Sequence, residues 1–186
     1  VRVYYKIALS LSKNYKLKIL SPSGEDDFNN PEIEIIPKNR FMLLNLFLNA
    51  YRYKPDHIIC VEPLTLLPGI LMKLLRKTNL FYDCHEFFAL DFAGRMKNCR
   101  SIAFYLYNKF ENMLVSFTDG VITVNKIMEE EYKRFHQNVV VCANYPVLKE
   151  LAPSSAKIFD FIYTGSISTD RGMLKILVAA KNLVIT

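Results

Sequence analysis

The sequence lacks cysteine pairs at the spacing that zinc sites use. Its four cysteines are Cys60, Cys84, Cys99 and Cys142, and none belongs to a Cys-x-x-Cys motif. We therefore expect no metal site. All but Cys99 fall in predicted strands, where we expect small buried thiols that stay reduced.

Long apolar runs are also missing. No run reaches the roughly 18 residues that a membrane-spanning helix needs. The most apolar candidate, residues 64–75, is interrupted by Pro68 and Lys73. No signal peptide is visible either. We expect a cytoplasmic protein that can reach the inner face of the membrane.

Basic clusters are missing, although basic residues are in excess. The chain has 24 Lys and Arg against 18 Asp and Glu, which gives a net charge of +6. No run of five or six basic residues occurs, so we do not expect nucleic acid as a partner. The excess charge favours phosphates, nucleotides or acidic lipid. The basic residues expected at an anionic membrane are Lys73, Arg76, Lys77 and Lys97.

What the sequence does contain is an alternation of strands and helices. Apolar strands are predicted at residues 16–20, 32–36, 57–61, 79–84, 121–124, 139–142 and 159–163. Helices are predicted at residues 1–14, 40–53, 64–77, 100–117, 126–136 and 173–183, and residues 89–98 are expected to form an irregular loop. This order predicts an α/β protein with a Rossmann-like, doubly wound parallel sheet. The spacing of Phe104, Tyr105, Tyr107 and Phe110 predicts aromatics that pack in the core, and Asn125 is expected to cap the helix that follows it.

The order of the first elements predicts a truncated domain. A helix comes first and the strand at residues 16–20 follows it, whereas a doubly wound domain begins with a strand. We therefore expect the first strand to lie upstream of Val1. At the other end, composition changes around Pro153, which predicts a first domain over residues 1–147, a linker over 148–157 and the start of a second domain over 158–186.

Polar residues follow three of the predicted strands. They are Glu62, the stretch Asp83–Glu86 and Asn144. Because ligands of open parallel sheets bind outside the carboxyl ends of the strands, these residues predict one shared cleft that binds substrate. His85 and Glu86 are the candidates for acid–base chemistry. A lone histidine at this place would more often cap the next turn. The interpretation of His85 as a site residue therefore depends on the polar residues around it.

A second candidate site follows the strand at residues 159–163. The loop after it contains Gly165, Ser166, Arg171 and Gly172. Small residues let the backbone approach a ligand, the following helix start favours anions, and an arginine can meet a diphosphate. The loop is neither a Walker motif nor a G-x-G-x-x-G motif, so an ordinary strand-to-helix turn is an equal alternative.

Six short pieces of sequence, in order, resemble one enzyme family. They are Arg2-Val3 with the helix after it, Pro55-Asp56-His57-Ile58-Ile59 with Glu62-Pro63, Tyr82-Asp83-Cys84-His85-Glu86, Thr118-Asp119-Gly120-Val121-Ile122-Thr123-Val124, Asn144-Tyr145-Pro146, and Tyr163-Thr164-Gly165-Ser166 with Arg171-Gly172. Together they are similar to the N-terminal part of a retaining glycosyltransferase of the GT-B fold, family four, the group 1 glycosyltransferases.

The resemblance implies an activity and residue roles. Such enzymes transfer a sugar from a nucleoside-diphosphate-sugar to a saccharide or lipid-linked acceptor, in polysaccharide or glycolipid synthesis, without a metal or other cofactor. His85 would then lie near the transferred sugar and its phosphate, with Asp83 and Glu86 supporting it or facing the acceptor. Gly165 and Ser166 would admit the donor diphosphate, and Arg171 would neutralise its charge.

The resemblance has two departures. Many relatives carry an arginine where this chain has Ser166, and the pair of glutamates that holds the donor is absent because the sequence stops at Thr186. We therefore expect a fragment that is inactive alone. Two alternatives stay open: a sugar-nucleotide epimerase of the same fold, and a non-enzymatic module that binds a sugar nucleotide or a partner.

Overall fold

The computed structural model describes residues 7–21, 33–36, 39–96, 98–145 and 172–184. The chain divides into two compact units, Val1–Tyr145 and Pro146–Thr186. In the second unit the described part is Gly172 and helix α7, Met173–Val184. The predicted linker and the predicted strand at residues 159–163 lie outside the described residues.

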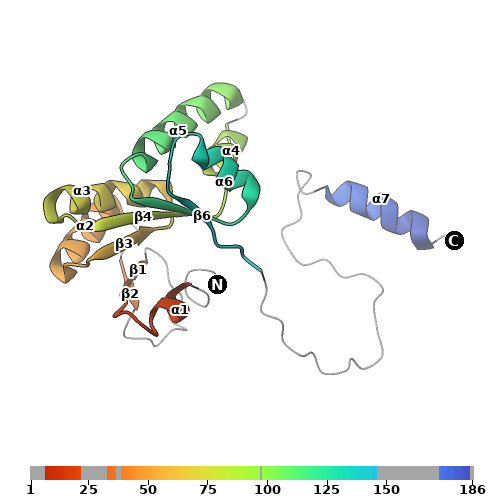
Figure 1. Cartoon of the computed structure of the whole chain (residues 1–186). Coiled ribbons are helices and arrows are strands. Elements are labelled where there is room, and N and C mark those ends of the chain that lie inside the picture. Colours follow the sequence, from red (N-terminus) through yellow and green to blue (C-terminus); the bar gives the residue numbers. More distant parts are fainter. Residues whose placement is uncertain (1–6, 22–32, 37–38, 97, 146–171, 185–186) are drawn as a thin grey trace, which may run out of the picture. The chain divides into compact units, whose positions relative to one another are not determined.

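A four-stranded parallel sheet forms the centre of the first unit (Figure 1). Its strands are β3 His57–Cys60, β4 Asn79–Cys84, β5 Gly120–Thr123 and β6 Val139–Val141. They lie in the order β3-β4-β5-β6, and every neighbouring pair is parallel. The α/β class with a parallel sheet flanked by helices is thus confirmed, and it is compatible with a Rossmann-like fold.

Helices alternate with these strands along the chain. They are α2 Met42–Tyr53, α3 Leu66–Arg76, α4 Phe88–Gly94, α5 Arg100–Val115 and α6 Lys126–Lys133, with a short 3-10 turn at Pro63–Thr65. The alternate β4 residues Leu80, Tyr82 and Cys84 are completely buried. They form the core with residues of α3, α5 and α6: Leu66, Leu114, Val115, Met128 and Tyr132.

Gly69 allows α3 to approach the sheet closely. A Cβ atom at this position would lie 2.7 Å from Leu80 Cδ1 and 2.9 Å from Cys60 Sγ. Both distances are shorter than van der Waals contact, so any side chain here would push the helix off the sheet or force the core to repack.

A second, smaller sheet precedes the main one. Strands β1 Ile19–Ser21 and β2 Ile33–Ile35 pair in parallel, and the short helix α1 covers Leu9–Leu11. The Tyr53 hydroxyl at the end of α2 donates a hydrogen bond to the Glu34 carboxylate of β2. Lys18 lies over the Tyr53 ring and pairs with Glu34 at 3.6 Å. These contacts attach the small sheet to α2.

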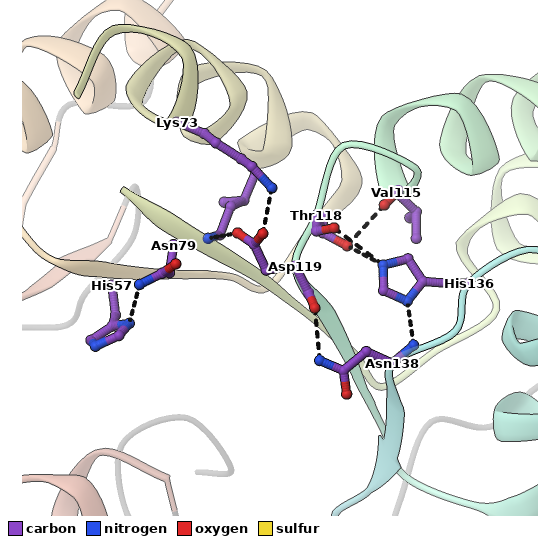
Figure 2. Close-up of polar contacts among 9 residues, drawn as sticks. His57, Lys73, Asn79, Val115, Thr118, Asp119, His136 and Asn138 are labelled. Atoms are coloured by element: carbon purple, nitrogen blue, oxygen red, sulfur yellow. Dashed lines mark hydrogen bonds and ion pairs between the residues drawn. The ribbon is translucent and has the colours of Figure 1, made fainter. Parts of the chain in front are cut away.

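The amino ends of the main strands are tied together by polar side chains (Figure 2). We call Lys73, Thr118, Asp119, His136 and Asn138 the amino-end clasp. One Asp119 carboxylate oxygen accepts from the Leu80 amide at 2.8 Å and the other from Lys73 Nζ at 2.6 Å. The Asp119 amide in turn donates to the Leu80 carbonyl at 2.7 Å. Asp119 thereby pins the start of β5 to the start of β4.

His136 completes this clasp at the start of β6. The Asn138 amide can only donate, so His136 Nδ1 accepts its hydrogen bond at 3.1 Å. Nε2 then carries the ring proton and donates to the Thr118 carbonyl at 3.2 Å. The Asn138 side chain donates to the Asp119 carbonyl at 2.7 Å. Every polar atom of the ring has a partner.

Three local predictions from the sequence are wrong. Residues 89–98 are not all irregular, because Phe88–Gly94 forms helix α4, which buries Ala89 and Ala93. Cys142 follows the end of edge strand β6, and its thiol is exposed rather than buried. On α5, where core aromatics were expected, Tyr105 is 63% exposed.

Candidate functional site

The expected substrate residues follow the carboxyl ends of the strands, opposite the amino-end clasp. Cys60 pairs with Tyr82, Cys84 with Thr123, and Thr123 with Val141, so the strands end nearly level. Glu62 comes two residues after β3, and Asn144 comes three residues after β6. We call Glu62, Asp83, His85, Glu86 and Asn144 the carboxyl-end site.

The members of this site differ in exposure. Glu62, Glu86 and Asn144 are exposed, and His85 is partly buried. Asp83 is the last residue but one of β4 and is completely buried. The structure therefore brings exposed carboxylates to the edge of the sheet, but places the Asp83 carboxyl inside the protein.

His85 carries the least satisfied polar atom of the site. Its Nδ1 is buried and has no hydrogen-bond partner within the described residues. The ring lies edge-on to the Phe88 ring at the start of α4, with centroids 5.7 Å apart and planes at 88°. A buried polar atom without a partner costs about 1 to 3 kcal/mol. One ring nitrogen thus lies buried next to Phe88 without a partner in the described part of the chain.

A buried polar cluster lies beneath the end of β4. The carboxylate of Glu111, from α5, is buried, and its Oε1 accepts from Tyr82 at 2.8 Å and from Tyr132 at 2.7 Å. Cys84 Sγ lies 3.1 Å from the Tyr132 hydroxyl and 3.2 Å from the Glu86 carbonyl. The cluster therefore joins β4, α5 and α6 to the turn that carries His85.

Burial dominates the electrostatics of this cluster. It raises the pKa of Glu111 above its ordinary value, although the hydrogen bonds from Tyr132 and Tyr82 partly oppose the rise. Burial also raises the pKa of the Cys84 thiol to about 12. The phenols of Tyr82 and Tyr132 have raised pKa values for the same reason. Cys84 and both phenols therefore stay protonated at neutral pH, where they can donate hydrogen bonds.

Tyr107 of α5 lies beside the carboxyl-end site. Its ring stacks on Phe92 of α4 with centroids 4.8 Å apart. Burial raises the pKa of its hydroxyl, and the negative charges of Glu111, Glu62 and Asp91 raise it further. The negative charge of Glu62 therefore acts on the Tyr107 hydroxyl.

The sequence pattern did not single out Glu111 or Tyr107 as polar site residues. Tyr107 was assigned to core packing, and Glu111 belongs to a helix of ordinary appearance. One signal was present: Glu111 follows Tyr107 by four residues and precedes Leu114 and Val115 by three and four, which is the spacing of a buried helix face. An acid on such a face points to a buried polar cluster.

The second candidate site lies almost wholly outside the described residues. Gly165, Ser166 and Arg171 fall there. Gly172 is described, and it immediately precedes α7 with φ +71°, a conformation that favours glycine. The Ile176 amide donates to the Gly172 carbonyl at 3.1 Å. The Gly172 carbonyl therefore accepts a hydrogen bond from the first turn of α7.

Metal ligands and membrane spans were sought over the described residues. In that part of the chain, no three His, Cys, Asp or Glu side chains come together as metal ligands. No helix among the described residues is long and apolar enough to cross a membrane. A scan against models of protein families finds no match, and a search of curated proteins finds no similar protein.

Proposed function

We propose that this chain is part of a retaining glycosyltransferase of the GT-B fold that uses a nucleoside-diphosphate-sugar. The observation that carries the proposal is His85, whose buried Nδ1, just beyond the carboxyl end of β4, has no partner among the described residues. Ligands of open parallel sheets bind at this edge. A sugar hydroxyl or a phosphate oxygen would supply the hydrogen-bond partner that the described part of the chain does not.

The division of the sheet supports a truncated domain. Doubly wound domains commonly order their strands 3-2-1-4-5-6, with the first strand in the middle. Here β1 and β2 form one parallel group, β3 to β6 form another, and among the described residues no strand joins the two groups. The contacts of Tyr53 and Lys18 hold the small sheet on the side of α2, which leads into β3. A strand supplied from upstream would pair with β1 and β3.

The resemblance implies a separate role for each candidate residue. Transfer breaks the bond between the sugar and the diphosphate, forms a bond to an acceptor oxygen, and releases the acceptor's proton. His85 binds the sugar and its phosphate, and the exposed Glu86 and Glu62 face the acceptor. Arg171, with the backbone from Gly165 to Gly172, stabilises the negative charge that develops on the leaving diphosphate. The buried Asp83 supports the strand end and does not contact the acceptor directly.

The test is an assay of nucleoside diphosphate release by the longer protein that we propose contains this chain. A panel of sugar nucleotides is supplied with an acceptor extract. We expect His85→Ala and Arg171→Ala to lower the rate by about 100-fold or more. His57→Ala is the matched control, because His57 is exposed at the amino end of β3, on the opposite edge of the sheet.

The outcomes separate the competing functions. A rate of diphosphate release that neither substitution lowers would show that the protein is an enzyme but would contradict the proposed site. A protein that binds the donor without releasing its diphosphate would support the binding module, and interconversion of sugars on the intact donor would support the epimerase. Sugar transfer by residues 1–186 alone would contradict the proposal that the chain is a fragment.

A further inference from the structure

Helices α2 and α3 expose an unusual number of large apolar side chains. We call them the leucine patch: Leu44, Leu48 and Tyr51 on α2, and Leu71, Leu74 and Leu75 on α3. Leu74 and Leu75 are 68% and 62% exposed, and Leu44 and Leu48 are each 52% exposed. Within each helix these residues recur every three or four positions, so each set forms one exposed stripe. The two helices pack against each other.

The charges on these two helices are all of one sign. Neither α2 nor α3 contains an acidic residue. Both helices end in exposed basic residues, Arg52 and Lys54 on the first and Arg76 and Lys77 on the second. The Arg76 guanidinium lies 4.0 Å from the centre of the Tyr51 ring. This contact fixes a cation and an aromatic ring together where the two helices end.

One of the basic residues expected to meet a membrane has another partner. Lys73 is held by Asp119 in the amino-end clasp at 2.6 Å. Lys97 lies outside the described residues. Arg76 and Lys77 remain, and the structure adds Arg52 and Lys54 from α2. The basic edge of the leucine patch is therefore built from two helix ends rather than one.

Helix α6 lacks this combination of exposed apolar side chains with only basic charges, whereas α7 shares it, with Leu174 and Val178 exposed and no acidic residue. Helix α6 also exposes a large apolar residue, Ile127 at 72%, but it carries Glu129, Glu130 and Glu131 in its middle. An apolar stripe flanked by acids would be repelled by an anionic surface. An apolar stripe with only basic residues is the pattern of an element that lies in a membrane interface.

We propose that the leucine patch docks this protein onto an anionic lipid surface. The leucines and Tyr51 enter the boundary between headgroups and acyl chains, while Arg52, Lys54, Arg76 and Lys77 contact lipid phosphates. The charge pattern selects lipid over a second copy of the chain, because two such basic edges would repel each other. The proposal stands on α2 and α3 alone and does not require glycosyl transfer.

The test measures sedimentation of the full chain with lipid vesicles. One set contains phosphatidylcholine mixed with phosphatidylglycerol, and the other contains phosphatidylcholine alone. We expect binding to the anionic vesicles that weakens as salt is added. Binding that is equal on both kinds of vesicle, or absent from both, would overturn the proposal.

Two double variants and one control locate the surface. Arg76→Gln with Lys77→Gln should weaken binding about fivefold for each charge removed. Leu74→Gln with Leu75→Gln should weaken it by about tenfold or more. Ile127→Gln removes an equally exposed apolar residue from the acidic helix α6 and should leave binding unchanged.

Folding and self-association are checked on the same samples. The substituted side chains are exposed, so far-ultraviolet circular dichroism should show unchanged helix content. Light scattering should show that the mass of the free chain is the same for all variants. A dimer that Leu74→Gln with Leu75→Gln dissociates would overturn the proposal and assign the patch to contact between copies.

Discussion

The polar groups at the two ends of the main sheet differ in how completely they are hydrogen-bonded within the protein. At the amino ends, the His136 ring and the Asp119 carboxylate have a partner for every polar atom. At the carboxyl ends, His85 has a buried nitrogen with no partner in the regions that the structure describes, and Glu62 and Glu86 are exposed. The clasp therefore holds the strands together, whereas the carboxyl-end site keeps hydrogen-bonding capacity for a ligand at some cost in stability.

We expect the largest effect on stability from disrupting the buried cluster beneath the carboxyl-end site. Glu111→Ala would leave the hydroxyls of Tyr82 and Tyr132 buried without an acceptor and open a cavity. We expect a loss of about 3 kcal/mol or more in the free energy of unfolding, measured with urea. Glu130→Ala, on the exposed side of α6, should change it by less than about 0.5 kcal/mol.

The same residue predicts a pH dependence. The pKa of Glu111 is raised in the folded protein, so the folded protein binds a proton at this carboxylate more tightly than the unfolded chain does. The stabilisation is complete below the unfolded pKa and is lost as the pH rises through the folded pKa. The glutamine of Glu111→Gln cannot ionise. As the pH rises over this range, the free energy of unfolding of the wild type should therefore fall relative to that of Glu111→Gln. A constant difference would contradict the raised pKa.

The next largest effect is expected at the amino-end clasp. Asp119→Ala removes the acceptor of both the Leu80 amide and Lys73, and should lower the free energy of unfolding by about 2 kcal/mol. Burial alone would raise the pKa of Asp119, but the Leu80 and Lys73 hydrogen bonds lower it overall. The stabilisation is therefore present above the unfolded pKa and is lost as the pH falls through the folded pKa.

Asp91 is a matched control for Asp119. It also pairs with a basic residue, Arg95 at 2.5 Å, but both side chains are exposed on one helix. Asp91→Ala should therefore change stability by less than about 1 kcal/mol. Equal losses for the two variants would show that the clasp is no more than a surface ion pair.

A smaller difference in stability is expected between substitutions of one exposed polar residue at each end of the main sheet. Asn138→Ala removes the hydrogen bond to the Asp119 carbonyl and should cost about 1 kcal/mol. Glu86→Ala at the carboxyl-end site should change stability by less than about 0.5 kcal/mol. Thermal or urea unfolding of the two variants measures both values.

The sequence pattern predicted the architecture better than the polar chemistry. Apolar runs such as residues 58–61 and 80–82 are continuous, which is typical of strands buried in a parallel sheet, and they form most of β3 and the middle of β4. Asn125 was expected to cap α6, and its side chain does accept from the Met128 amide at 2.9 Å. These features depend on neighbours in the sequence, so a single chain reveals them.

The remaining features depend on distant contacts. Glu111 meets Tyr82 across 29 positions, and Asp119 meets Lys73 across 46. No local pattern reports such pairs. Helix α4 was missed because a seven-residue helix gives only a short periodic signal, and its formation relies on packing against α5. The placement of His85 after a strand was predictable, but its unpartnered nitrogen was not.

The most direct test of the comparison replaces one histidine at each end by phenylalanine and measures urea unfolding. His85→Phe removes the buried unpartnered nitrogen beside Phe88 and should raise the free energy of unfolding by about 1 kcal/mol. His136→Phe deprives the Asn138 amide and the Thr118 carbonyl of their partners and should lower it by about 1 to 2 kcal/mol. Losses of equal size in both variants would contradict the account, because His85 would then be as structural as His136.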